Sequence, residues 1–176
     1  MIQENAAVSL SVYDLSAGLF ARGLGNLKRT LTKGEAHAAA SGMVPAELLD
    51  AQLATDMNSL AVQVHWATEG AKLAIARLVG AAPTASSNDA TSFADLQRRI
   101  DTTIAYLSTL ASLDLEAGLE RVIEISHRGG SKKLTGGQFL LEFAIPSFYF
   151  HVTTAYAILR HKGVELTKGD FLGGSS

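Results

Sequence analysis

The sequence predicts an all-α four-helix bundle with one small β-hairpin between the third and fourth long helices. Three observations predict it. Ala is the commonest residue, with 27 copies against only 3 of Pro, and Ala loses the least conformational freedom on entering a helix. Four long segments carry apolar residues three and four positions apart, the spacing of an amphipathic helix. One short segment alternates instead, as a half-buried strand does.

The first long helix is expected over residues 12–40, where leucines recur at helical spacing. Glycines interrupt it, and each costs about 1 kcal/mol relative to Ala. Small residues on a helix face indicate the close approach of another helix. Gly42 is a natural stop, and Pro45 begins a short helix over residues 45–49. The leucines are Leu15, Leu19, Leu24, Leu27 and Leu31, and the glycines are Gly18, Gly23, Gly25 and Gly34.

The second and third long helices are expected over residues 58–79 and 92–110. Between them, residues 81–90 are rich in Pro, Ser, Asn and Asp, which is typical of a loop. This loop is short for a domain linker, so it is interpreted as a crossover within one bundle. The apolar stripe of the second helix is Leu60, Val64, Thr68, Ala71, Ile75 and Leu78. That of the third is Phe93, Leu96, Ile100, Ile104 and Leu107.

The hydrophobic period changes after the third helix. Residues 121–128 are rich in β-formers, Gly129 and Gly130 indicate a turn, and residues 131–135 form a short return strand. The last long helix is expected over residues 137–161, with a kink or break at Pro146, because Pro removes a backbone donor. Its predicted apolar stripe is Leu141, Ile145, Phe148, Val152, Tyr156 and Leu159.

The composition excludes several classes of protein. The chain has 47% hydrophobic residues, only 18% charged residues, no Cys and a net charge of −2. It therefore has no disulfide scaffold, thiolate metal site or cysteine nucleophile, and no nucleic acid or membrane partner is expected. Residues 1–5 contain no basic residue, so a secretory signal is not expected and the protein is predicted to be cytoplasmic. Residues 1–172 are predicted to form one domain, with a disordered tail at 173–176.

Among five histidines, none is paired at i and i+4 as in a zinc-protease helix. His151 lies at the edge of an apolar stripe, where it is either a core-edge histidine satisfied by a hydrogen bond or a site residue. Gln63 and Asp56 share one flank of the second helix, and Gln63 meets His151 if the second and fourth helices are neighbours. His65 is expected to be semi-exposed. Lys72 is interpreted as a lysine whose stem covers apolar surface.

The end of the chain resembles a bacterial family known only as domain of unknown function nineteen ninety-three. The most specific stretch is FYFHVTTAYAILR at residues 148–160. That family is placed in the DinB-like superfamily of four-helix bundles. The resemblance implies an up-down-down-up bundle with a long crossover, and often a dimer. The other matching segments are residues 10–15, 53–57, 63–64, 71–72, 143–147 and 168–172.

Many DinB-like proteins bind a divalent metal through three histidines, one on the second helix and two on the fourth. With Leu159-Arg160 setting the register, the resemblance puts the last ligand on His151 and the preceding one on Ser147, which is a poor ligand. The helix-two ligand falls at residues 63–65, which include His65. The resemblance thus implies a degenerate site that holds Zn or Ni weakly at best. The predicted polar pocket is lined by His151, Gln63, Ser147, Tyr156 and Asp56.

Three functional hypotheses remain open at this point. The first is a small-ligand-binding or stress-associated module anchored by His151 and Gln63. The second is a divalent-metal-dependent transferase or hydrolase, as among thiol-dependent relatives, which needs a third ligand such as His65. The third is a purely structural homodimer.

A second apolar line on the second helix supports a homodimer. Val62, Trp66 and Leu73 lie opposite its main stripe, on the face that a monomeric bundle shows to water. A helix that is apolar on two faces is either sandwiched or part of an interface. The alternative is that the hairpin or the short helix at Pro45 covers this line.

Overall fold

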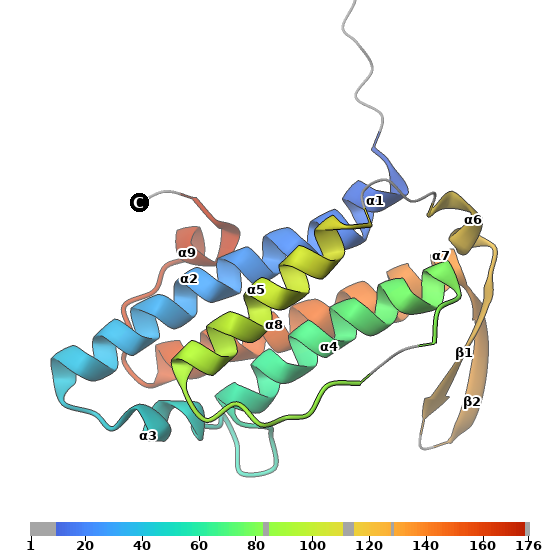
Figure 1. Ribbon diagram of the computed structural model, residues 1–176. Coiled ribbons are helices and arrows are strands. Elements are labelled where there is room, and N and C mark those ends of the chain that lie inside the picture. The colour runs from blue at the N-terminus through green and yellow to red at the C-terminus, as the bar shows by residue number, and fades with distance from the viewer. Residues whose placement is uncertain (1–9, 83–84, 111–114, 128, 175–176) are drawn as a thin grey trace, which may run out of the picture.

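The computed structural model describes residues 10–82, 85–110, 115–127 and 129–174. Four long helices dominate it (Figure 1). They are α2 (Ala17–Ser41), α4 (Leu60–Val79), α5 (Phe93–Ser108) and α8 (Ile145–His161). The shorter helices are α1 (Val12–Leu15), α3 (Pro45–Leu49), α6 (Glu116–Leu119), α7 (Gly136–Phe139) and α9 (Lys168–Leu172), with a π-helical turn η1 (Leu140–Ala144). The strands are β1 (Val122–His127) and β2 (Gly130–Thr135).

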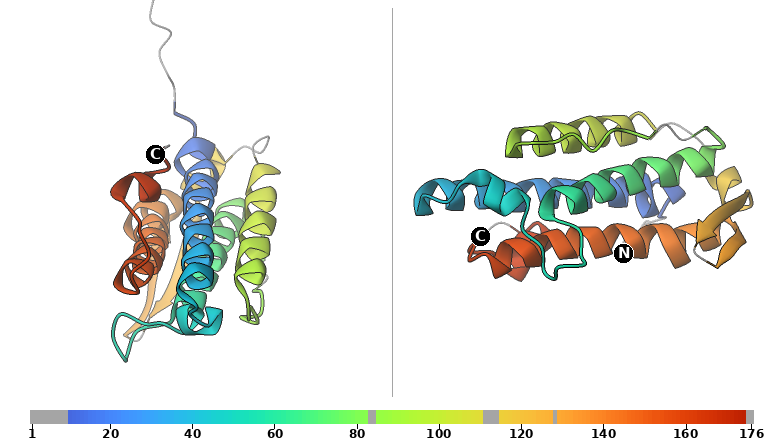
Figure 2. Two further views of the ribbon diagram at one scale, coloured as in Figure 1. Left: turned by 90° about the vertical axis from the view of Figure 1, so that its left-hand side faces the viewer. Right: turned by 90° about the horizontal axis from the view of Figure 1, so that it is seen from below.

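The four long helices form an up-down-down-up bundle, as predicted. In Figure 1, α2 and α8 run in one direction and α4 and α5 in the other. The connection from α4 to α5 therefore has to run back along the length of the bundle. In the end-on view of Figure 2, α8 and α5 lie on opposite sides of α2 and α4. The main helix contacts are α4 with α8 and α2 with α5, followed by α4 with α5 and α2 with α8.

The core follows the predicted stripes. Every stripe residue of α4 is buried, from Leu60 to Leu78. Two glycines of α2 mark close helix approach: a Cβ added at Gly23 would lie 2.6 Å from Phe148 Cε1, and one at Gly34 would lie 2.8 Å from Leu159 Cδ2. The expectation that small residues mark a helix contact is thus confirmed at these two positions, both facing α8.

The predicted helix over residues 12–40 is wrong at its start. The chain breaks at Ser16, whose backbone has φ −130° and ψ −92°, so α1 and α2 are separate helices. The Ser16 hydroxyl is buried and donates to the carbonyl of Val12, so the break satisfies its polar groups locally. As a result Leu15 falls outside the α2 stripe and is 48% exposed.

The last long helix departs from the α-helical register before Pro146. Pro146 has no N–H for the carbonyl four residues earlier, and its ring would clash there. The chain accommodates Pro146 through the π turn η1 and then continues as α8. The extra residue in the π turn changes which side chains before Pro146 face the core. Leu140 is buried, whereas Leu141, which was placed in the predicted stripe, is 73% exposed.

The predicted hairpin is confirmed. Strands β1 and β2 pair antiparallel, and the opposed residues Ile123 and Leu134 are its buried pair. The hairpin leads into α7, which packs against α6 and β2. A Cβ added at Gly136 would overlap the Gly118 carbonyl oxygen, so Gly136 lets α7 meet α6 at backbone distance, while a Cβ at Gly118 would lie 2.6 Å from the Leu78 carbonyl oxygen of α4. The short helices α6, α7 and α9 were not predicted from the sequence as separate helices.

No helix of the described residues is long and apolar enough to cross a membrane. Residues 1–5, on which the secretory prediction depends, lie outside the described residues. So do residues 175–176 of the tail predicted to be disordered. Gly173, the first residue of that tail, ends α9 with a left-handed φ of 82°.

Candidate functional site

Buried polar side chains concentrate on α4. Among the described residues, half of the buried polar or charged positions belong to this one helix. Thr68 lies in the core stripe and donates to carbonyls of its own helix, and the other three point to two flanks. One flank faces α8 and the other faces α5 and the crossover. The four residues are Gln63, His65, Thr68 and Glu69.

On the flank facing α8, Gln63 holds His151. The Gln63 side chain is 1% exposed, and its Nε2 donates to the carbonyl of Asn58 at 3.1 Å. Its Oε1 lies 2.7 Å from His151 Nδ1. Because the amide nitrogen is committed to a carbonyl, the amide oxygen is the acceptor and His151 Nδ1 carries the proton. The structure therefore brings together the two residues that the sequence placed on facing flanks.

The second ring nitrogen of His151 is available. Burial lowers the pKa of His151 from its ordinary value of 6.5, so the imidazole is neutral at neutral pH and Nε2 has a lone pair. Among the described residues, Nε2 has no hydrogen-bond partner. It is not one of the unpartnered side-chain atoms that are shielded from solvent, so it is accessible. An oriented, neutral, accessible imidazole nitrogen can accept a hydrogen bond, take a proton or ligate a metal ion.

The other predicted pocket residues lie apart from this pair, except for one. Ser147 is half-buried, one helical turn before His151 on the same face of α8. Tyr156 instead packs edge-on against Phe171 of α9, with ring centroids 5.7 Å apart. Asp56 is exposed in the loop before α4. Of these three residues, only Ser147 therefore lies on the same face as His151, beside the Gln63 contact already described.

His65, predicted to be semi-exposed, is buried at 6% exposure. It lies two residues after Gln63, about 200° around the helix, and so faces α5 rather than α8. Its Nδ1 lies 3.2 Å from Arg99 Nη1, and since Arg can only donate, Nδ1 is the acceptor. Burial and, next, the Arg99 charge lower the pKa of His65. The described residues contain no cluster of three or more His, Cys, Asp or Glu that could hold a metal ion, and the structure does not bring His65 to His151.

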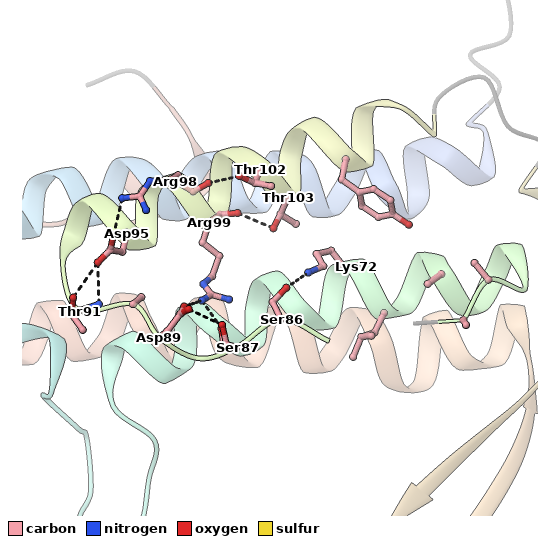
Figure 3. Close-up of a pocket in the computed structure, with 16 residues that line it drawn as sticks. Lys72, Ser86, Ser87, Asp89, Thr91, Asp95, Arg98, Arg99, Thr102 and Thr103 are labelled. Atoms are coloured by element: carbon pink, nitrogen blue, oxygen red, sulfur yellow. Dashed lines mark hydrogen bonds and ion pairs between the residues drawn. The ribbon is translucent and has the colours of Figure 1, made fainter. Parts of the chain in front are cut away.

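A groove of about 810 Å³ opens on this second flank, between α4, α5 and the crossover (Figure 3). Its apolar lining includes Leu73, Ala76 and Tyr106. Beneath it, buried Glu69 accepts from Lys72 Nζ at 2.7 Å and from the backbone N–H of Ser86 at 2.9 Å. Burial raises the pKa of Glu69, but these hydrogen bonds outweigh burial and the net shift is downward.

Arg99 spans the groove from α5 to the crossover, as Figure 3 shows. Its Nη2 donates to the Ser87 carbonyl at 2.6 Å and to Asp89 Oδ1 at 2.9 Å, while its Nε is buried and has no partner among the residues that the structure describes. Residue spacing alone does not predict this network, and Lys72, interpreted as a lysine that covers apolar surface, is the partner of Glu69. The one available signal was the Glu69–Lys72 spacing, which suits an ion pair on a helix.

The residues of the predicted dimer face differ in their surroundings. Trp66 is 44% exposed, with its ring edge-on to His65 at a centroid distance of 5.1 Å. Val62 and Leu73 are half-buried, and Leu73 lines the groove beside Ala81 and Ser86 of the crossover. The crossover thus approaches part of this apolar line, and Trp66 is its exposed member.

The bundle with its long crossover is of the DinB class. A crystal structure of a DinB family member protein from Shewanella denitrificans matches it with a TM-score of 0.84 and 39% sequence identity, covering 93% of each chain. The chain belongs to the family described as domain of unknown function (DUF1993), whose family model matches residues 12–172. No curated protein matches the chain. Both findings agree with the resemblance found in the sequence.

Proposed function

We propose that this protein is a small-molecule-binding bundle whose polar anchor is the His151 imidazole. The observation that carries the proposal is a chain of two hydrogen bonds, here called the relay, that links the Asn58 carbonyl to Gln63 and Gln63 to His151. This relay fixes the tautomer and the ring orientation and leaves Nε2 free. A histidine held in this way by a second residue is the arrangement of a binding or ligating imidazole, because the supporting hydrogen bond determines which nitrogen faces the ligand.

The chemistry of this nitrogen defines the class of ligand. A neutral Nε2 accepts a hydrogen bond, so it suits a hydroxyl or an N–H group of a small molecule. It also suits a Zn or Ni ion, but Ser147 stands where a second histidine ligand would be needed. A tight zinc site takes three or four protein ligands, so a metal at this position would be weakly held and open to exchange. We therefore favour the binding module over the metal-dependent transferase or hydrolase.

Histidine-selective ¹⁵N NMR tests the proposal directly. The protein is purified without a chelating resin, and its metal content is measured by mass spectrometry. It is then titrated with Zn²⁺ and separately with a panel of small alcohols and amides. We expect saturable shifts of the His151 Nε2 resonance that are lost in His151→Ala. In Gln63→Leu, which removes the relay, the tautomer preference should weaken.

His161→Ala is the matched control, because His161 is exposed at the end of α8. It should bind as the unmodified protein does. If neither the metal nor any compound of the panel moves the His151 signal, the binding proposal is refuted. Stoichiometric metal in the purified protein, with loss on His151→Ala, would instead support the metal-dependent enzyme.

A further inference from the structure

The groove between α4, α5 and the crossover is a second site, separate from the α4–α8 seam. We propose that it binds a small carboxylate with an apolar body, taken side-on by Arg99 in place of Asp89. The inference goes beyond the binding role of His151 and does not depend on it, because Gln63 and the groove residues lie on different flanks of α4.

The guanidinium of Arg99 is held in place but not fully used. Its Nη1 is committed to His65 and its Nη2 to the crossover, so the plane of the group is fixed. The side chain is 13% exposed. Its Nε is excluded from solvent and has no hydrogen-bond partner within the described part of the chain. Native proteins rarely leave a buried donor unpaired, and such a group marks a place where a partner is missing.

The geometry of Asp89 explains why Nε is unpaired. In a guanidinium, Nε–H and one Nη–H point the same way and together match the two oxygens of a carboxylate. Asp89 offers only Oδ1 to Arg99, at 2.9 Å. Its Oδ2 accepts from the Ser87 hydroxyl at 2.6 Å. Asp89 therefore accepts from Nη2 but not from Nε, whereas a free carboxylate could accept from both nitrogens at once.

Asp89 is also the most easily displaced counterion of the groove. Its side chain is 72% exposed, and ion pairs with such exposed groups contribute little to stability. The Glu69 partner of Lys72 is buried by contrast, at 2%. The rest of the groove favours an apolar body, because Leu73, Ala76 and Tyr106 line it. A ligand carboxylate would take the position that Asp89 Oδ1 now marks.

Titration with benzoate, followed through the Arg99 Nε–Hε NMR signal, tests this site. Benzamide serves as the uncharged probe and inorganic phosphate as the anion without an apolar body. We expect saturable binding of benzoate and none of benzamide. Asp89→Asn removes the internal competitor, so benzoate should bind up to about five-fold tighter. Arg99→Lys keeps the positive charge but removes the paired Nε–H and Nη2–H donors that would hold a carboxylate. It should weaken benzoate binding about 10- to 100-fold.

Arg98→Met is the matched control, because Arg98 lines the same groove but is 69% exposed and pairs with Asp95. It should leave benzoate affinity within about two-fold. Circular dichroism establishes that each variant is folded. The proposal is overturned if benzoate fails to move the Arg99 Nε–Hε signal saturably, if Asp89→Asn does not tighten binding, or if Arg98→Met weakens it as much as Arg99→Lys. Tighter binding of phosphate than of benzoate would overturn the carboxylate assignment. His151 resonances, followed in the same samples, report separately on the α4–α8 seam.

Discussion

Replacing Gly23 by Ala tests whether α2 and α8 meet as closely as the structure has them. The new Cβ would lie 2.6 and 2.8 Å from Phe148 Cε1 and Cζ, well inside carbon–carbon contact distance. Phe148 has little room to move: it is 1% exposed, and its ring centroid lies 4.9 Å from that of Phe20 and 5.2 Å from that of Tyr149. Overpacking of this kind costs about 1–3 kcal/mol.

Gly25→Ala is the matched control, since no atom of the described residues lies within 4 Å of a Cβ added there. Both substitutions gain about 1 kcal/mol of helix propensity, and only Gly23→Ala has the overpacking cost. We expect Gly25→Ala to stabilise the protein and Gly23→Ala to fall about 1–3 kcal/mol below it. Urea unfolding followed by far-ultraviolet circular dichroism measures this difference. Equal stabilisation by both substitutions would refute the close approach of α2 and α8.

Three further outcomes are expected. Burial lowers the pKa of both His65 and His151 below 6.5 in the folded protein, so the unfolded chain takes up protons at a higher pH than the folded protein does. The urea concentration at the midpoint of unfolding should therefore decrease as the pH is lowered below about 6.5. Leu140→Ala should cost about 2–5 kcal/mol and Leu141→Ala less than about 0.5 in urea unfolding, and equal costs would contradict the π-turn register. Trp66→Glu should delay elution in size-exclusion chromatography if the apolar line of α4 forms a homodimer, whereas unchanged elution counts against that face.

Periodicity was sufficient to predict the parts of the fold that depend on local repetition. The stripe of α4 is wholly buried because it repeats without interruption over the length of the helix. The same wheel geometry placed Gln63 and His151 on facing flanks, and their 2.7 Å contact follows once α4 and α8 are neighbours. The hairpin was recognisable because the period changed from helical to alternating at residues 121–128.

What the sequence did not predict depends on contacts between distant residues. Pro146 signalled a disturbance, but whether the chain bends, stops or adds a residue is decided by packing on both sides, so the exposure of Leu141 could not be read from spacing. Buried His65 contacts Arg99, which is 34 positions away in the chain. Arg99 in turn is positioned by the crossover, whose residues have no hydrophobic period. The groove could therefore not be predicted from the sequence, because it depends on a segment without hydrophobic periodicity.

The distribution of polar groups along the chain gives a physical reason why the two proposed sites lie on opposite flanks of one helix. Only 18% of the residues are charged, so most helix faces can pack by apolar contact alone. In α4 the α8 flank and the α5 flank each carry buried polar groups that need partners, since a buried polar group without one costs about 1–3 kcal/mol. Gln63 finds its partners in Asn58 and His151, and Glu69 in Lys72 and Ser86. Within the described residues, one nitrogen on each flank has no partner, His151 Nε2 and Arg99 Nε, and these are the two atoms at which we propose that a ligand completes the hydrogen bonding.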